Sequence, residues 1–292
     1  MTSDSERERE AEKRSLSAAA RERFVRLARG PEEKIDLAEA ALLIAAEEYP
    51  GLDVAAYLTR TDDLAARVRA YVRTPPSTVL LRDTDEVALA ALHHVLFEEE
   101  GLEGDPVEER YHPLYHPQNS FLNEVLDRKR GMPITLSLLY CEVARRAGLN
   151  AVGVALPNHF IAEFRGEHFS VLVDPYSRGA RVSAEERARL PREYLVAASK
   201  KQILARMLNN LKGAYRLRGP LPKALAAVER ILVLSPSVDQ VRDRGLILAQ
   251  MTMFGPAWFD LKLYARLAPG APDAKATADA ADQLWKQMGR LN

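Results

Sequence analysis

Two residues near the middle of the chain, His159 and Asp174, could perform acid–base or nucleophilic chemistry together. An imidazole that is oriented by a carboxylate can take a proton from a hydroxyl, a thiol or a water molecule, as in catalytic triads. The alternative is a histidine that is held by a purely structural aspartate. Which of the two applies depends on the groups that lie beside the imidazole.

A predicted β-hairpin brings these two side chains together. Two strand-like runs flank a short loop in which Gly166 suits the first central position of a type II′ turn. Such a two-residue turn pairs Phe164 with Phe169, and the same register places His159 opposite Asp174. Directly opposed residues share one face of the sheet, with their Cβ atoms about 5 Å apart.

The remaining histidines do not predict a metal site. His112 and His116 are four residues apart, but a proline follows each of them and prevents the helix that would direct both at one ion. His93 and His94 are consecutive and are expected on different faces of one helix. Walker, G-x-G-x-x-G, H-E-x-x-H and C-x-x-C motifs are absent from the sequence. We therefore expect neither a metal nor a cofactor.

The elements that must position His159 and Asp174 lie in the third of four predicted segments. Residues 1–16 form a charged, solvated leader, and residues 17–100 form a helical N-terminal region with apolar positions at three- and four-residue spacing. Residues 101–199 combine an irregular loop, an apolar helix that ends at Gly148, and the strand-like runs. A helix that is apolar around its circumference is usually buried, so we expect this one at the centre of the region.

The last region, residues 200–292, repeats itself. An offset of 33 residues superposes Pro236 on Pro269 and Ala224 on Ala257. A period near 34, with small residues where helices cross, is typical of tetratricopeptide repeats. Two repeats need a further cover, which a capping helix over residues 276–288 could supply. We expect this region to be a docking surface for an unknown protein partner.

Composition excludes several classes of partner. The chain has 41 basic and 41 acidic side chains, so it offers no net field that would attract nucleic acid or acidic lipids. Uncharged runs such as residues 245–259 are too short to cross a membrane. A single cysteine cannot form an internal disulfide, and no apolar targeting segment follows the charged leader. We therefore expect a cytoplasmic protein.

Several segments of the chain resemble, in order, the SirB-type proteins, which are bacterial proteins with a transglutaminase-like core and tetratricopeptide repeats. The segments are NSFLNEVL at 119–126, GMPITL at 131–136, ARRAG at 144–148, PNHF at 157–160 and DP at 174–175. The resemblance covers roughly residues 30–273. It implies an α+β fold with a papain-like core, in which a central helix packs on an antiparallel sheet.

The resemblance also assigns roles to the site residues. Active members of the transglutaminase-like superfamily place a cysteine at the N-terminus of the central helix, where free N–H groups stabilise a thiolate. Their histidine and aspartate lie on adjacent strands, which makes His159 and Asp174 the remnant of a triad. The position of the cysteine falls on Pro133, give or take one residue, and Met132, Pro133 and Ile134 carry no nucleophilic atom.

Two other side chains of the central helix could replace the missing thiol. Cys141 lies on the order of 10 Å along the helix axis beyond Ile134, so we expect it to be inert packing. Thr135 is nearer and is a weak candidate nucleophile, although a hydroxyl at a helix start commonly bonds backbone. Three asparagines within the matching segments are expected to line the site, with capping or loop bonding as the alternative; they are Asn119, Asn123 and Asn158.

These residues leave two functions open. The first is a non-catalytic transglutaminase-like protein that acts as a protein–protein interaction or regulatory module through its repeats. The second is a hydrolase or acyl-transfer enzyme for amide or peptide bonds, which uses His159 and Asp174 with Thr135, a water molecule or another residue. Losing a covalent nucleophile removes a whole reaction path, whereas general-base assistance alone is worth ~10²- to 10⁴-fold. The sequence therefore favours the binding function.

Overall fold

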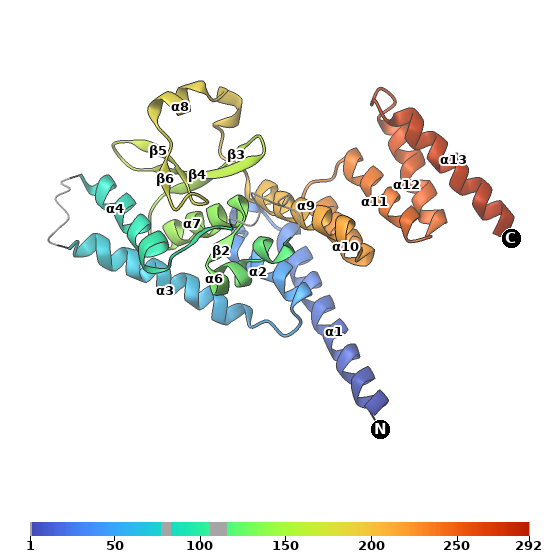
Figure 1. Cartoon of the computed structure of the whole chain (residues 1–292), viewed down its shortest axis with the longest axis horizontal. Coiled ribbons are helices and arrows are strands. Elements are labelled where there is room, and N and C mark those ends of the chain that lie inside the picture. The colour runs from blue at the N-terminus through green and yellow to red at the C-terminus, as the bar shows by residue number, and fades with distance from the viewer. Residues whose placement is uncertain (1, 77–82, 106–115, 292) are drawn as a thin grey trace. The chain divides into compact units, whose positions relative to one another are not determined.

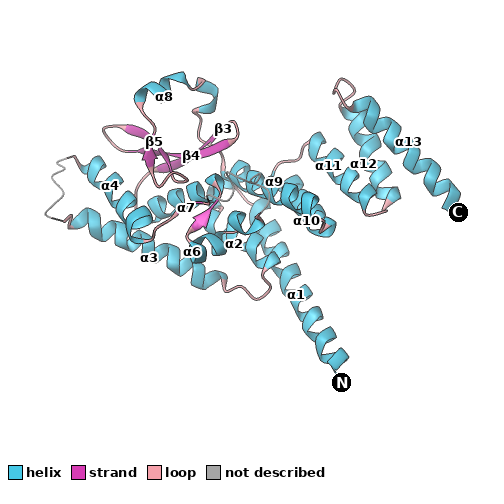
Figure 2. Cartoon of the chain, in the orientation of Figure 1, coloured by secondary structure: helices cyan, strands magenta, loops and turns pink. Residues whose placement is uncertain are grey.

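The computed structural model describes residues 2–76, 83–105 and 116–291 of the chain. The chain divides into two compact units, Met1–Ile203 and Leu204–Asn292. Helices predominate in both units, and the first unit also contains a small antiparallel sheet, so the fold is α+β, as predicted (Figure 2).

The N-terminal part of the first unit is helical. Its first helix includes the predicted leader: residues 5–16 are exposed, whereas Phe24 and Ala28 are fully buried. The charged leader is therefore a solvated helix rather than a separate segment. The helical elements of this part are α1 (Thr2–Arg29), η1 (Glu32–Lys34), α2 (Leu37–Glu48), α3 (Val54–Arg73), α4 (Thr84–His93) and the π-helical turn η2 (His94–Glu99).

A buried helix, α7 (Pro133–Arg146), lies at the centre of this unit. Pro133 occupies its first turn, where a missing N–H costs nothing, and Gly148 follows its end with a φ of 83°. The helix contacts α2, α3 and α6 (Leu122–Arg128) as well as strands β3 and β4 (Figure 1). Its burial on all sides explains why its sequence is apolar around the circumference.

Charges at helix ends fix α7 to the N-terminal helices. Asp36 caps α2, because its side chain accepts a hydrogen bond of 2.9 Å from the backbone N–H of Glu39. The same carboxylate accepts hydrogen bonds from Arg145 at 3.1 Å and from Arg146 at 2.8 Å. An acid at one helix N-terminus thus meets two cations at another helix C-terminus, which suits both helix dipoles.

The main sheet is antiparallel, with strand order β3-β4-β5-β6. One of its faces carries a small core of Val154, Ile161 and Leu172, against which Val182, Leu190 and Leu195 pack. A second, parallel pair precedes α7. The strands are β1 (Glu103–Gly104), β2 (Arg130–Gly131), β3 (Ala151–Leu156), β4 (His159–Arg165), β5 (Ser170–Asp174) and β6 (Ala180–Arg181), followed by α8 (Ala184–Arg189) and η5 (Arg192–Tyr194).

The register predicted for the β4–β5 hairpin is wrong by two residues. Phe164 pairs with Val171 rather than with Phe169. The turn lies one residue further along the chain than predicted: the N–H of Gly166 donates to the carbonyl of Phe169 at 2.9 Å, so Glu167 and His168 lie between this bonded pair, and Gly166 does not have a positive φ. The turn is therefore not of the predicted type II′. A shift of two residues preserves the face on which each side chain lies, so His159 and Asp174 stay on the same side.

The second unit consists of helices that follow one another as antiparallel neighbours: the C-terminal part of α9 (Lys200–Arg218), α10 (Leu221–Leu234), α11 (Val238–Gln250), α12 (Phe254–Leu267) and α13 (Ala274–Leu291). A Cβ added to Gly245 of α11 would lie 2.8 Å from the side chain of Leu261 in α12. A small residue is required where these two helices cross, as the repeat pattern predicts. The predicted capping helix corresponds to α13. Among the described residues, no helix is both long enough and apolar enough to cross a membrane.

Candidate functional site

The imidazole of His159 contacts the carboxylate of Asp174, as the hairpin predicts. The distance between His159 Nε2 and Asp174 Oδ2 is 3.0 Å. His159 begins β4 and Asp174 ends β5, so the two lie at the same end of the sheet. In the observed register they are diagonal neighbours rather than directly opposed, and the hydrogen bond spans the diagonal.

The Asp174 carboxylate also anchors the turn that follows it. It accepts hydrogen bonds from the Ser177 hydroxyl at 2.8 Å and from the backbone N–H of Tyr176 at 3.0 Å. Burial raises the pKa of this carboxyl. The hydrogen bond and charge of His159 and the hydrogen bonds from Ser177 and Tyr176 outweigh the effect of burial, so the pKa lies below its usual range. Asp174 is thus ionised and partnered, whatever role His159 has.

Tyr176 connects His159 to the loop before α7. Its ring lies edge-on to the imidazole with centroids 6.1 Å apart, and its hydroxyl donates to the backbone carbonyl of Asp105 at 3.0 Å. A Cβ on Gly104 would lie 2.5 Å from the tyrosine ring, so the ring packs directly on that backbone. Sequence reasoning missed Tyr176 and Asp105, because they come from a turn and a loop that have no periodic pattern.

Asn119 lies at the centre of a buried polar network rather than at an open mouth. It is 0% exposed, and its amide donates to the Asp105 carboxylate at 2.9 Å while its side-chain oxygen accepts from Arg128 at 2.9 Å. Its backbone carbonyl accepts from the N–H of Met132 at 3.0 Å, directly before α7. Asn119 therefore fixes the start of the central helix.

The other two asparagines have different environments. Asn123 in α6 is buried, and its side-chain oxygen has no hydrogen-bond partner within the described residues. Asn158 is exposed in the turn between β3 and β4, with a φ of 57°. Asparagine tolerates this left-handed conformation better than most residues, which explains its presence there.

The start of α7 offers no accessible nucleophile. Met132 precedes the helix, and Pro133 and Ile134 begin it. Thr135 is 0% exposed, and its hydroxyl has no hydrogen-bond partner in the part of the chain that the structure describes. His159 therefore makes no hydrogen bond to that hydroxyl, and a substrate cannot reach it without displacing the surrounding side chains.

Cys141 does not replace the missing thiol. It lies in the interior of α7 and is 7% exposed. Burial, together with the neighbouring charge of Glu142, raises the pKa of the thiol far above its ordinary value. A thiol that remains protonated is a poor nucleophile, so Cys141 is packing, as its position along the helix predicts.

The histidines outside the sheet have separate environments. His112 lies outside the described residues, and His116 precedes η4 (Pro117–Ser120). His93 and His94 are partly exposed, and their rings lie 3.7 and 2.6 Å from the carboxylate of Glu98. Glu98 reaches both imidazoles from the π-helical turn η2, which follows α4.

Two carboxylates and an imidazole beside the hairpin loop could present ligand atoms to a cation. Asp83, Asp85 and His168 place an oxygen or nitrogen atom within 4.8 Å of one another. One Asp85 oxygen already accepts a hydrogen bond of 2.6 Å from the backbone N–H of His168. Its partners lower the pKa of Asp85, chiefly through that backbone hydrogen bond. The group therefore serves first to hold the hairpin loop.

Two family models and several known proteins match this chain. Residues 55–209 match the family model of the transglutaminase-like superfamily, and residues 211–282 match a tetratricopeptide repeat model. A UPF0162 protein of Xylella fastidiosa strain Temecula1 is 33% identical, over 83% of this chain and 88% of its own length. A UPF0162 protein of Pseudomonas aeruginosa is 30% identical, over 68% of this chain and 72% of its own length.

Two further proteins resemble this chain less closely, one over a smaller share of the chain and the other at a lower identity. F-box only protein 21 of Mus musculus is 27% identical over 49% of this chain, which corresponds to 24% of its own length. A crystal structure of menin, described as revealing the binding site for the Mixed Lineage Leukemia protein, aligns over 91% of this chain and 68% of its own, at 14% identity and a TM-score of 0.42.

Proposed function

This chain belongs to the transglutaminase-like superfamily and to the family of the UPF0162 proteins, and on that premise we propose that it is a non-catalytic member which acts as a protein-interaction or regulatory module. Its repeats would hold the protein partner, and its core would serve as scaffold. We also propose that it is a SirB-type protein of the cytoplasm, in which the N-terminal helices, the core and the repeats are separate functional regions.

The observation that carries this proposal is the chemistry at the start of α7. The imidazole–carboxylate pair is complete, with 3.0 Å between His159 and Asp174. The start of α7 presents Met132, Pro133 and Ile134, none of which can form a covalent intermediate. A base without a nucleophile retains at most the modest advantage of activating water.

The repeat unit supplies the surface that a partner would need. Large apolar side chains remain exposed on its last two helices: Phe259 is 59% and Trp285 is 58% exposed. The Trp285 ring lies against Trp258, with centroids 4.9 Å apart, so it is held rather than free to turn away. Aromatic residues are enriched among the residues that dominate binding energy at interfaces.

The second function remains an acyl-transfer or hydrolytic reaction at amide bonds. One feature favours it: the Thr135 hydroxyl lies in the first turn of α7 and is unpaired among the described residues. Its complete burial weighs against it, because a carbonyl substrate must approach a nucleophile to within about 3–3.5 Å. We therefore retain this reaction as the alternative outcome of the experiments below.

Affinity capture with the full-length chain tests the interaction. Proteins retained by the tagged parent are compared with those retained by Phe259→Ser, Trp285→Ser and His159→Gln. Val196→Ser is the matched control, because Val196 is 64% exposed in the first unit. We expect loss of the same retained protein with both repeat variants and no loss with His159→Gln or the control. Retention that depends on His159 and not on the repeats would contradict the proposal.

A further inference from the structure

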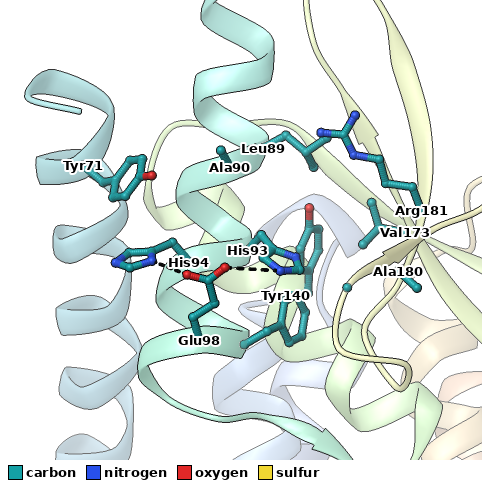
Figure 3. A pocket seen from close by; sticks show the side chains of 12 residues that line it. Tyr71, Leu89, Ala90, His93, His94, Glu98, Tyr140, Val173, Ala180 and Arg181 are labelled. Carbon is teal, nitrogen blue, oxygen red and sulfur yellow. Dashed lines mark hydrogen bonds and ion pairs between the residues drawn. The ribbon is translucent and has the colours of Figure 1, made fainter. Parts of the chain in front are cut away.

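A cavity in the first unit lies apart from the His159 site. It has a volume of about 420 Å³ and is bounded by α3, α4 and η2 on one side and by α7, β5 and β6 on the other (Figure 3). Val173 lines it, whereas its neighbour in β5, Asp174, binds His159. Successive residues of a strand point to opposite faces, so the two sites lie on opposite faces of the sheet.

A buried tyrosine gives this cavity an unused hydrogen-bond donor. Tyr140 of α7 is 1% exposed, and its hydroxyl has no hydrogen-bond partner among the described residues. Burial raises the pKa of this phenol well above its ordinary value, so the group stays protonated and can donate. Burying a hydroxyl without a partner costs free energy, which makes an unpaired donor beside an empty volume informative.

A cation lies at the end of the cavity to which this hydroxyl points. Figure 3 shows the Tyr140 oxygen directed toward the part of the cavity that holds the Arg181 guanidinium, and the two groups interact electrostatically. The terminal nitrogens of Arg181 bind the carboxylate of Glu86 at 3.1 and 2.6 Å. Its Nε makes no hydrogen bond within the described residues, so one cationic donor is still available.

The opposite end of the cavity has the opposite polarity. Glu98 lies between His93 and His94, away from Arg181 in the same view (Figure 3). Between the two ends the walls are apolar and buried; they include Leu89, Phe97 and Val173. A pocket with apolar walls and a few convergent polar groups is the usual form of a small-molecule site.

We propose that this cavity binds a small monocarboxylic acid with an apolar body. Its carboxylate accepts hydrogen bonds from the Tyr140 hydroxyl and the Arg181 Nε, and its body lies against Leu89, Phe97 and Val173. The carboxylate is excluded from the Glu98 end by like charge. This inference is independent of whether the repeats bind a protein, because every residue it uses lies in the first unit.

A matched series of three probes tests the proposal on the full-length chain. The probes are para-fluorophenylbutyrate, its primary amide and para-fluorophenylbutylamine, titrated by ¹⁹F NMR to their solubility limits. We expect saturable binding of the acid, weaker binding of the amide and none of the amine. Tyr140→Phe and Arg181→Gln should each weaken the binding of the acid by about tenfold, which is the effect of losing one hydrogen bond to a charged group.

Two controls separate binding from folding. Tyr57→Phe removes a tyrosine hydroxyl that binds Asp127 outside the cavity, and it should leave the affinity for the acid unchanged. Without ligand, Tyr140→Phe should melt at the same temperature as the parent or higher, because it removes an unpaired buried hydroxyl. The proposal is overturned if the acid shows no saturable binding, if the amine binds more tightly than the acid, or if neither cavity variant lowers the affinity for the acid.

Discussion

The carboxylate of Asp174 accepts hydrogen bonds from three groups: the imidazole of His159, the hydroxyl of Ser177 and the backbone N–H of Tyr176. This environment explains both its depressed pKa and its structural value, since the same group orients the imidazole and closes the turn after β5. A depressed carboxyl pKa stabilises the fold above the unfolded pKa, and that stabilisation is lost as the pH falls through the folded pKa.

Replacing Asp174 should therefore have a pH-dependent cost. We expect Asp174→Asn to lower the free energy of unfolding by about 1 kcal/mol at pH 7, because charged hydrogen bonds are lost. The difference from the parent should shrink as the pH falls below the ordinary carboxyl pKa and through the depressed pKa of Asp174 in the folded parent. Urea unfolding over this pH range measures it. Asp63→Asn, at an exposed position of α3, is the control, and a cost that is independent of pH would contradict the account.

The thiol of Cys141 should be almost unreactive in the folded chain. Burial raises its pKa, so the thiolate fraction is small, and the side chain is only 7% exposed. We expect iodoacetamide to alkylate the native chain at least about 100-fold more slowly than the chain in denaturant, since labelling requires opening of α7. Labelling is followed by mass spectrometry with glutathione as reference. Equal rates in both conditions would show that Cys141 is accessible.

One side-chain contact was predicted correctly from the sequence, although from an incorrect register. Contact between His159 and Asp174 follows from their positions on one predicted hairpin. The network of Asp105, Asn119 and Arg128 could not be predicted as a unit, because its members come from a loop, a short 3₁₀ turn and a helix end. Tertiary packing alone brings such residues together.

At the level of elements, the hairpin shows why an incorrect register still gave the correct pair. Strand side chains alternate with a period of two, so an error of two residues moves a side chain along the face but not across it. The pairing with Phe169 assumed that Gly166 supplies a positive φ. Its actual role is spatial: a Cβ there would lie 2.3 Å from the Asp85 carboxylate.

Gly166→Val tests this role. We expect it to destabilise the chain by about 1–3 kcal/mol, because the added side chain displaces the Asp85 carboxylate from the N–H of His168. In a double-mutant cycle, Asp85→Ala should remove most of the further cost of Gly166→Val, since the clash is then absent. Chemical denaturation of the four proteins measures the cycle. Additive costs would indicate backbone strain at Gly166 and not a clash.

Helices were the most predictable elements. Proline and glycine mark the two ends of α7, and aspartates cap α2 and α3. The exposed leader was predicted as solvated, but its continuation as the helix α1 was not, because its charges recur without an apolar stripe. Only the burial of Phe24 and Ala28 shows where this helix joins the first unit.

At the scale of the whole molecule, the repeat unit depends on its own internal ion pair. Asp260 of α12 is 2% exposed and binds Arg244 of α11 through two contacts of 2.7 Å. Asp260→Ala should cost about 2 kcal/mol, because it leaves a partly buried guanidinium unpaired. Lys262→Ala, which breaks the exposed pair with Asp282, should cost at most about 0.5 kcal/mol.

Fluorescence can follow the repeat unit separately, because the two tryptophans of the chain, Trp258 and Trp285, both lie in it. In denaturant unfolding, the fluorescence transition of Asp260→Ala should have its midpoint at a lower denaturant concentration than that of the parent, and the midpoint of Lys262→Ala should be unchanged. Equal shifts for both variants would mean that burial of the pair contributes nothing.

The chain combines a complete imidazole–carboxylate pair with a central helix whose start carries no nucleophile. The most direct test is the release of ammonia or amine from glutamine-containing peptides and simple amides by the purified full-length chain and by His159→Ala. The account predicts the same background rate for both proteins. A parent rate that exceeds that of His159→Ala by about 100-fold or more, the size of general-base assistance, would show that the site is catalytic.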